Sequence, residues 1–467
     1  MSGKQHNIYV RAHTVQLEKK ERKSTHQEDE PKWPDYALVF DSETRITTDL
    51  TLTFGFWRFC ELRDNKYVCT EEGIFHDDHS LIAAEFDLLR EYVSVTRPDT
   101  TDDGCDRLRL HSRSKFIAET LGIAIQAKAL IVCFNAGFDL SRLAVDWETA
   151  KNGGWSLILS QWRNPRTGEI KANKFFPRIV IKALNSKAAI IHSTRAPMSE
   201  PGKKSKRVRL WPSARFLDLR TLLWALRNKS YSLKTACEKL KTGHQKLDHT
   251  PTGTISVEEV AYARNDVACT VDVLNAAKQE FDLHPIAPGP DRMFSPASVA
   301  KSYLEELHIL HPKEKVKDAN IAYGIFMQSY FGGRAECRIR NWEVPVCPVD
   351  FMSQYSTVNE LLDNWSVLTA QYVTFPDATK EVEQLLSQIT LERCFERQLW
   401  PSFRFFALVR PDNDILPVRT VYNGTTQNIG INYLTSKEPI WFAGPDIMAS
   451  ILLTGKVPHI EKAKVKT

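Results

Sequence analysis

Two short apolar segments, each followed at once by polar or acidic residues, constrain the fold of this chain more than any other feature. The run YALVF at residues 36–40 is apolar up to Asp41, and ALIVCF at residues 129–134 leads into NAGFD. Short apolar runs of this kind are typical of central strands in a sheet that is covered on both faces. The β-rich segment LTLTFGFWRFC at residues 50–60 should pair with the first run as a hairpin or meander.

Apolar residues recur at helical spacing between and after these strands. We expect helices over residues 80–93, 112–129 and 257–281, and a further helix directly after residue 134. Residues 152–216 have the alternation and turn residues of strands and loops. Strands and helices mixed in this way predict an α/β fold.

The composition is that of a globular chain. Hydrophobic residues make up 42% and charged residues 25% of the sequence, which are ordinary values for such proteins. No apolar run approaches the ~20 residues of a membrane-spanning helix, and the start MSGKQHNIYV lacks the apolar core of a signal peptide. The nine cysteines form no C-x-x-C pair, which favours reduced thiols. We therefore expect a cytoplasmic, reducing location and no membrane partner, with an organellar or viral origin left open.

Two composition shifts divide the chain. Residues 1–35 are polar and rich in charge, so we expect a disordered tail. The Pro-rich segment HPIAPGPDRMFSP at residues 284–296 predicts a linker. The linker would separate a domain at residues 36–283 from a second one at residues 297–467.

Three acidic clusters lie on the predicted strands and helices. Asp41 and Glu43 are two residues apart at the end of a strand, so their side chains should face the same side. Asp139 follows the second apolar run, at the start of a helix. Tyr262 and Asp266 are one helical turn apart and should also face the same way.

Four carboxylates that converge in this way would repel one another unless cations neutralised them. Oxygen ligands suit Mg²⁺, or alternatively Mn²⁺, better than zinc. Two such ions about 3.5–4 Å apart can clamp the attacking and leaving oxygens of a phosphoryl displacement. The neighbouring tyrosine would orient the attacking water. The alternative interpretation is that these are ordinary surface acids beside a packed tyrosine.

These clusters, taken in order, resemble a known group. D-x-E-T at residues 41–44, N-x-x-F-D at residues 135–139 and Y-x-x-x-D at residues 262–266 resemble the DEDD-type 3′–5′ exonuclease domain of family B DNA polymerases. The resemblance implies a ribonuclease H-like, mixed-sheet domain at residues 36–283. It implies a water-orienting role for Tyr262, and metal binding by Asp41, Glu43, Asp139 and Asp266.

The same resemblance implies contacts with DNA. It places Asn135 and Phe138 against the 3′-terminal nucleotides. Ser232 and Leu233, in YSLKTA, resemble a Ser/Thr-Leu element that contacts single-stranded DNA in this family. From the residues alone, Asn135 is also a candidate helix N-cap and Phe138 a candidate core residue.

The resemblance continues beyond the predicted linker. The segment SYFGGRAE, with Tyr330, Gly332, Gly333 and Arg334, resembles the Y-x-G-G element that joins the exonuclease and polymerase modules and touches the template strand. Glycines in such an element permit positive φ and a close approach of the backbone to a phosphate.

DFMSQYS at residues 350–356 resembles the first palm motif, D-x-x-S-L-Y-P. The resemblance implies metal binding by Asp350 and packing of Tyr355 under the incoming sugar. Gln354 and Ser356 depart from the motif, which has an apolar residue and a proline at these places.

The remainder of a polymerase is missing from this sequence. It contains no K-x-x-x-N-S-x-Y-G fingers motif and no D-T-D after Asp350, and only 117 residues follow Asp350. We therefore expect residues 297–467 to be an incomplete palm region, and no DNA polymerisation by this chain alone. A fragment, a split enzyme and a decayed gene remain open as explanations.

The expected activity is removal of nucleotides from single-stranded 3′ ends by a two-Mg²⁺ proofreading exonuclease. The expected partners are single-stranded 3′ ends, primer–template DNA and a separate polypeptide that supplies the rest of the polymerase. Two alternatives remain. One is a non-catalytic nucleic-acid-binding subunit with the same fold, and the other is a DEDD-type ribonuclease, which would have no need of the palm-like residues 330–356.

Overall fold

The fold was analysed in a computed structural model. It describes residues 5–15, 31–100, 107–151, 153–198, 208–250, 252–316, 318–332, 339, 341–421 and 427–465. The chain forms two compact units. One is His26–Leu307, and the other combines Met1–Thr25 with His308–Thr467.

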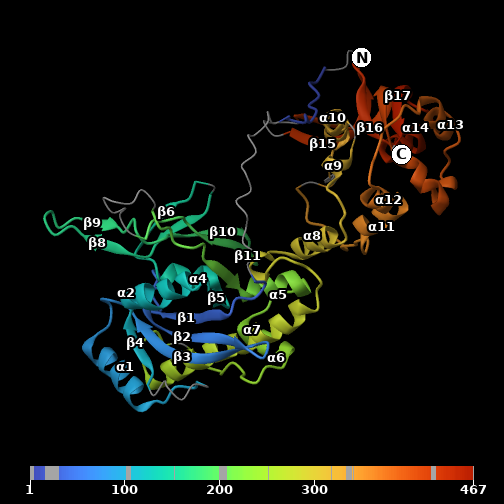
Figure 1. The fold of residues 1–467 in the computed structure, drawn as a ribbon. Helices are drawn as coiled ribbons and strands as arrows, with labels where there is room; N and C mark the ends of the chain where they lie inside the picture. The colour runs from blue at the N-terminus through green and yellow to red at the C-terminus, as the bar shows by residue number, and fades with distance from the viewer. Residues whose placement is uncertain are drawn as a thin grey trace. The chain divides into compact units, whose positions relative to one another are not determined.

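A six-stranded mixed sheet forms the centre of the His26–Leu307 unit, which we call the α/β unit (Figure 1). The first apolar run, β1, pairs antiparallel with β2 as expected and parallel with β5, the second apolar run. The mixed α/β class is therefore confirmed. In sheet order the strands are β12 (Arg215–Asp218), β5 (Leu130–Cys133), β1 (Tyr36–Thr44), β2 (Leu52–Arg63), β3 (Lys66–His76) and β4 (Arg109–Ser112).

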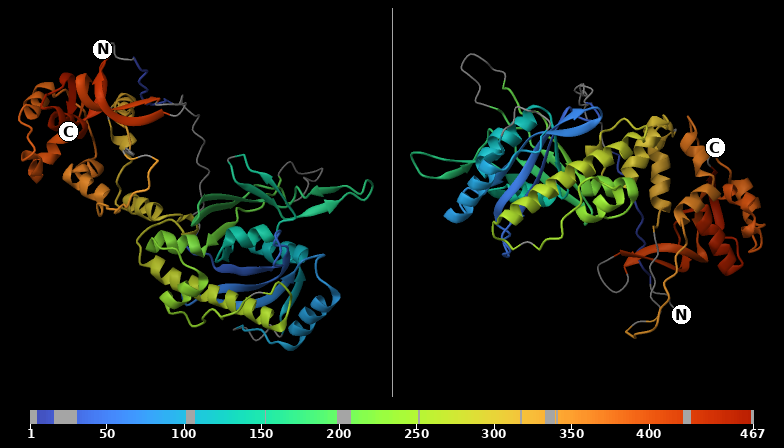
Figure 2. Two further views of the ribbon diagram at one scale, coloured as in Figure 1. Left: turned by 180° about the vertical axis from the view of Figure 1, so that it is seen from behind. Right: turned by 90° about the horizontal axis from the view of Figure 1, so that it is seen from below.

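Helices cover both faces of this sheet (Figures 1 and 2). Alternate residues of β1 enter two separate cores, because successive side chains of a strand point to opposite faces. Ala37 and Val39 pack in the core beneath α7, whereas Leu38 and Phe40 pack in the core beneath α4. The helical segments are α1 (Ala83–Val95), α2 (Arg113–Lys115), the π-helical η1 (Phe116–Leu121), α3 (Gly122–Gln126), α4 (Ala136–Arg142), α5 (Leu219–Arg227), α6 (Leu233–Leu240) and α7 (Val257–Asp282).

A second, smaller sheet belongs to the same unit and lies between α4 and β12 in the sequence. Its strand order is β11-β10-β7-β6, and a separate hairpin, β8–β9, follows β7 along the chain. In Figures 1 and 2 the hairpin extends beyond the end of the large sheet. The strands are β6 (Asp146–Thr149), β7 (Trp155–Ile158), β8 (Gln161–Arg163), β9 (Ile170–Ala172), β10 (Ile179–Asn185) and β11 (Ala188–Ser193).

The segment expected as a linker, residues 284–296, packs against the α/β unit. Ile286 and Met293 are buried in the core beneath α7. Asp291 forms an ion pair with Arg215 of β12 at 2.5 Å. The short helix η2 (Pro290–Arg292) and then α8 (Pro296–Glu306) complete this unit, whose boundary lies at Leu307.

The second unit has its own core, built on a three-stranded sheet and a long hairpin. Residues 5–15, which we expected in a disordered tail, contact this unit: the Tyr9 amide donates to the Arg419 carbonyl at 2.8 Å. Residues 16–30 of the expected tail lie outside the described part of the chain. The strands are β13 (Phe405–Arg410), β14 (Asp412–Val421), β15 (Gln427–Thr435), β16 (Ile440–Ala443) and β17 (His459–Val465).

Short helices surround this second core. In the described ranges of the chain, no helix combines the length and apolarity that would let it span a bilayer. The helices are α9 (Pro312–Lys315), α10 (Ala319–Ser329), α11 (Gln354–Leu361), α12 (Asn364–Thr369), α13 (Thr379–Leu386), η3 (Arg393–Phe395), η4 (Arg397–Phe403) and α14 (Gly444–Thr454).

Candidate active site

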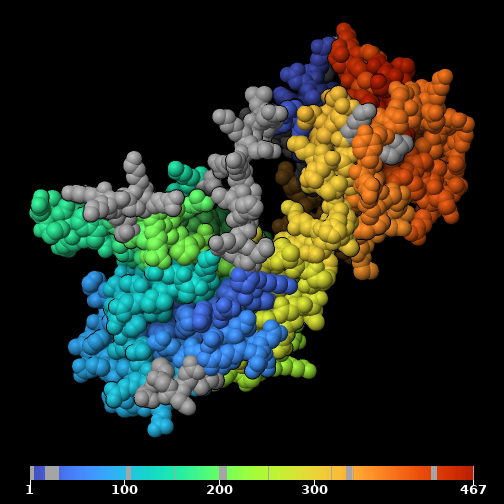
Figure 3. All heavy atoms as spheres, in the orientation of Figure 1, coloured from blue at the N-terminus to red at the C-terminus, as the bar shows by residue number. Residues whose placement is uncertain are grey.

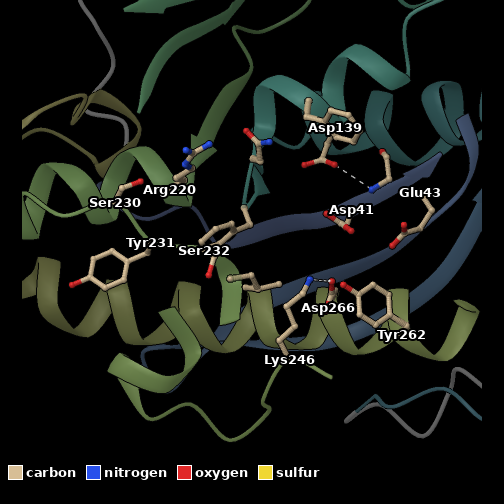
Figure 4. Close-up of a pocket in the computed structure, with 15 residues that line it drawn as sticks. Asp41, Glu43, Asp139, Arg220, Ser230, Tyr231, Ser232, Lys246, Tyr262 and Asp266 are labelled. Atoms are coloured by element: carbon tan, nitrogen blue, oxygen red, sulfur yellow. Dashed lines mark hydrogen bonds and ion pairs between the residues drawn. The ribbon is translucent and has the colours of Figure 1, made fainter. Parts of the chain in front are cut away.

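A pocket of about 600 Å³ opens at the C-terminal end of β1 in the α/β unit. Its size falls within the ~300–1,000 Å³ range of ligand sites. Figure 4 shows carboxylates gathered at one end of the pocket and a hydroxyl- and arginine-bearing wall at the other. The lining residues are Asp41, Ser42, Glu43, Phe134, Asn135, Phe138, Asp139, Arg220, Ser230, Tyr231, Ser232, Leu233, Lys246, Tyr262 and Asp266.

The strand β1 supplies two of the carboxylates. Asp41 and Glu43 lie two residues apart near its end and both line the pocket. Ser42 points to the opposite face and is buried, while its amide donates to Asp139 Oδ1 at 3.2 Å. The strand therefore presents two carboxylates and also ties the carboxylate of α4 to the same place.

The helix α4 brings Asp139 to the pocket from the other face of the sheet. Asn135 occupies its N-cap position, but the Asn135 side chain accepts no capping hydrogen bond. Asp218, at the end of β12, accepts from the Ala136 amide at 3.1 Å instead. The Asn135 side chain is thereby left exposed at the pocket. Phe138 is half-buried and lies under Arg142, 5.2 Å from ring centre to guanidinium.

The helix α7 supplies Tyr262 and Asp266, one turn apart, as the spacing predicts. Asp266 is 3% exposed and forms an ion pair with Lys246, which reaches in from the loop after α6. The Lys246 ammonium also lies 4.8 Å from the centre of the Tyr262 ring. Lys246 is thus the cation nearest this carboxylate among the described residues.

Burial and mutual repulsion raise the pKa values of the carboxylates. Burial and the charge of Asp266 raise the pKa of Asp41 to about 7. Burial and the charge of Asp41 raise the pKa of Glu43 to about 8. The pKa of Asp139 lies well above its usual range for the same reasons, and burial raises the pKa of Asp266 in spite of Lys246. Positive charge entering the pocket would lower the pKa of each carboxyl group and favour its ionised form.

The unsatisfied oxygen atoms in the pocket fit divalent cations. Asp139 Oδ2 and Asp266 Oδ1 are buried and have no hydrogen-bond partner, which is costly for acceptors that water cannot reach. An all-oxygen donor set is what Mg²⁺ and Mn²⁺ prefer. Among the described residues, no three Cys, His, Asp or Glu side chains are gathered closely enough to enclose an ion.

The other end of the pocket contains residues expected to contact DNA. Ser232 caps α6 by accepting from the Thr235 amide at 3.2 Å, and it remains exposed at the pocket. Leu233 lines the pocket while most of its side chain is buried in the core. Arg220 and Tyr231, which the sequence analysis did not single out, line the same wall.

The residues expected in a polymerase region belong to the second unit, and none of them lines this pocket. Tyr330 is 56% exposed and stacks under Arg11, and Gly332 has the positive φ of +82° that the glycine predicts. Asp350 is exposed in a segment without regular structure, and Tyr355 on α11 is 86% exposed. Gly333 and Arg334 lie outside the described residues.

No protein-family model matches the chain, and no curated protein matches its sequence. The sequence analysis missed two residues at or beside this site, Asp218 and Lys246, and only one of them stands in a recognisable sequence pattern. Asp218 follows an apolar strand, just as Asp41 does, whereas Lys246 lies in a loop without any pattern that marks it.

Proposed function

We propose that this chain is a two-metal 3′–5′ DNA exonuclease with a ribonuclease H-like fold, similar to the proofreading domain of family B DNA polymerases. The observation that carries the proposal is the gathering of Asp41, Glu43, Asp139, Asp266 and Tyr262 in one pocket from β1, α4 and α7. The central β1, antiparallel to β2 and parallel to β5, supports this fold. DNA polymerisation by this chain alone is not part of the proposal.

Asp41, Glu43, Asp139 and Asp266 would hold the cations. When bound, two divalent cations lower the pKa of an attacking water and stabilise the leaving 3′ oxygen. Tyr262 stays protonated at neutral pH, because burial raises its pKa to about 12. Its hydroxyl can therefore position a water by hydrogen bonding rather than remove a proton. Burial lowers the pKa of Lys246, but the charge of Asp266 outweighs that effect, so Lys246 stays cationic beside the reacting phosphate.

The remaining wall suits an unpaired terminal nucleotide. Phe138 offers a ring for a base, and the exposed Asn135 amide offers hydrogen bonds to it. Arg220 provides a guanidinium for a backbone phosphate at the end of the pocket away from the carboxylates (Figure 4). A frayed 3′ end would enter more readily than a paired one, because unpairing costs a few kcal/mol.

The test is digestion of 5′-labelled single-stranded DNA by the purified chain with Mg²⁺. We expect products shortened from the 3′ end, no activity in EDTA, and a loss of about 10³-fold or more in Asp41→Asn. Asp282→Asn is the matched control: Asp282 is the last residue of α7, pairs with Lys278 and does not line the pocket, so most activity should remain. Equal rates for Asp41→Asn and the unmutated chain would overturn the proposal.

The same assay separates the two alternatives. Faster digestion of single-stranded RNA than of DNA would identify a DEDD-type ribonuclease. Salt-sensitive binding of DNA without hydrolysis at any Mg²⁺ or Mn²⁺ concentration would identify a non-catalytic binding subunit.

A further inference from the structure

Residues 145–212, between the second and third acidic clusters, differ in charge from the rest of the chain. They contain 14 Lys and Arg against 4 Asp and Glu, a net charge of +10, whereas the whole chain carries +5. All other residues together therefore sum to −5. A strongly basic segment on an otherwise slightly acidic chain is the electrostatic footprint of a surface that binds a polyanion.

This segment forms the smaller sheet of the α/β unit and the β8–β9 hairpin. We call it the basic arm, of which residues 145–151, 153–198 and 208–212 are described. Leu157, Ile179 and Ile181 anchor the sheet by packing in the core beneath α4. The hairpin is outside that core. In Figure 3 the arm forms a ledge that projects from the body of the unit. The sheet of the arm is thus anchored to the unit at one side, and the hairpin projects from it.

Three tryptophans of the arm are exposed. Trp147 on β6 and Trp155 on β7 are 53% and 51% exposed, and their ring centres are 4.6 Å apart. Trp162 on β8 is 46% exposed and stands opposite Lys171 on β9. The neighbouring rings of Trp147 and Trp155 form a contiguous exposed apolar patch, and such patches can mark interaction sites. Every nucleic-acid base offers a flat face on which such rings can stack.

The carboxylates of the described arm are already engaged. Glu148 pairs with Arg178, Glu169 pairs with Lys171 at 3.0 Å, and Asp146 accepts from the Trp147 amide at 2.8 Å. The exposed cations without a carboxylate partner among the described residues include Lys151, Arg163, Lys182 and Arg195. These exposed positive charges are complementary to a phosphate backbone.

We propose that the basic arm binds single-stranded nucleic acid, with the tryptophans stacked on unpaired bases and the Lys and Arg side chains on phosphates. The charge alone would suit a duplex or an acidic protein. The exposed rings favour a single strand, because only unpaired bases present free faces. The surface would add to the grip of the proposed exonuclease on its substrate, yet binding here requires neither the carboxylates nor hydrolysis.

The test measures binding with hydrolysis prevented. Anisotropy of a labelled oligothymidylate is titrated with the full chain carrying Asp41→Asn, in EDTA, at several salt concentrations. Adding Trp147→Ala and Trp155→Ala should weaken binding by about 10-fold or more. Adding Lys151→Gln, Arg163→Gln and Lys182→Gln should reduce the slope of log K against log salt by about 2, since each phosphate contact contributes about 0.7.

Matched controls isolate the arm. Trp365→Ala removes a ring that is 55% exposed in the second unit, and Lys66→Gln with Lys301→Gln removes exposed charges outside the arm. Neither control should change the affinity. A circular dichroism melt of each variant shows that the fold is intact.

The possible outcomes are separable. Weaker binding of both oligothymidylate and oligouridylate by the arm variants supports the proposal. The oligonucleotide that the parent chain binds more tightly identifies the preferred polymer. Unchanged affinity and slope in both sets of arm variants, or tighter binding of duplex than of single strand, would overturn it in favour of another partner such as an acidic protein. Because hydrolysis is absent from the assay, the arm can be confirmed when the exonuclease proposal fails, and the reverse.

Discussion

Individual carboxylates in the pocket have pKa values that ordinary surface acids do not have. Asp41 and Glu43 titrate at about 7 and about 8, because burial and neighbouring negative charges disfavour their ionised forms. At neutral pH the metal-free pocket therefore retains protons. Cation binding would release them, which couples metal affinity to pH.

The stability of the metal-free protein should fall as pH rises. A carboxyl whose folded pKa is raised contributes stability that is complete below its unfolded pKa, near ~4, and is lost as pH rises through the folded pKa. For Asp41 and Glu43 that loss extends to about pH 7–8. We expect the Tm in EDTA to fall between about pH 5 and about pH 8.5, a window that brackets these pKa values. The fall should be smaller in Asp41→Asn.

Mg²⁺ at the upper pH should restore Tm in the unmutated chain. Asp146→Asn, an exposed acid of β6, is the control and should follow the unmutated profile. A Tm profile for Asp41→Asn that matches the unmutated chain at every pH would contradict the assigned pKa values.

Lys246 is expected to stabilise the metal-free pocket through Asp266. Their side chains are 26% and 4% exposed, so Lys246→Met would leave a buried carboxylate without its cation. We expect a loss of about 1–3 kcal/mol at pH 7, below the ~3–5 kcal/mol of a fully buried pair. Mg²⁺ should recover more stability in this variant than in the unmutated chain.

Urea unfolding with and without Mg²⁺ measures this effect. Lys234→Met is the matched control, because the side chains of its ion pair with Asp248 are 48% and 88% exposed and solvent screens such a pair. Equal losses in the two variants would show that Asp266 does not depend on Lys246.

At the scale of elements, the pairing of β1 with β2 positions the two strand carboxylates. Gly55 stands opposite Ser42, between Asp41 and Glu43 along the strand. A Cβ at Gly55 would lie 2.4 Å from the Asp41 carbonyl oxygen and 2.2 Å from the Phe75 ring. The glycine thus permits a close approach that no other residue allows without moving β1.

Gly55→Ala should therefore destabilise the α/β unit by about 1–3 kcal/mol, as overpacked cores do. It should also reduce the proposed exonuclease activity, because Asp41 must shift. Gly137→Ala is the control: Gly137 lies in α4, beside the site, and nothing is within 4 Å of its added Cβ. Helix propensity predicts a gain of up to ~1 kcal/mol there. Denaturant midpoints that rank the two variants the other way would refute this account of β1.

The local sequence pattern predicted whether a segment is a helix or a strand better than it predicted where that segment ends. The apolar runs at β1 and β5 and the helical spacing of α7 predicted the observed structure. The helix expected after residue 134 ends at Arg142, and the chain then enters β6, because the next residues pair with β7. The residues expected as one helix at 112–129 include the π-helical turn η1.

At the scale of the whole molecule, the start of the chain belongs to the second unit. Two hydrogen bonds join the start of the chain to β14. The Tyr9 amide donates to the Arg419 carbonyl, and Thr420 Oγ1 donates to the Asn7 carbonyl at 2.8 Å. Ile8 packs against the core of that unit. Residues more than 400 positions apart are thus neighbours, a relation that no local pattern indicates.

Deletion of residues 1–15 should accordingly loosen the second unit alone. Hydrogen exchange followed by mass spectrometry should show faster exchange in β14, which loses the bond from Tyr9, and unchanged exchange in β1, β5 and α7. An increase in exchange in the α/β unit as well, or no increase in β14, would contradict the conclusion that residues 5–15 stabilise the second unit alone.

The sequence alone determined the features that depend on neighbours along the chain. These are the buried strands, the paired orientation of Asp41 and Glu43, and the one-turn spacing of Tyr262 and Asp266, because backbone geometry repeats every two or about 3.6 residues. Only the tertiary structure decided that Lys246 faces Asp266, that Asp218 caps α4 in place of Asn135, and that the basic arm keeps its tryptophans exposed. Those features depend on which distant segments pack together, and packing is not periodic in the sequence.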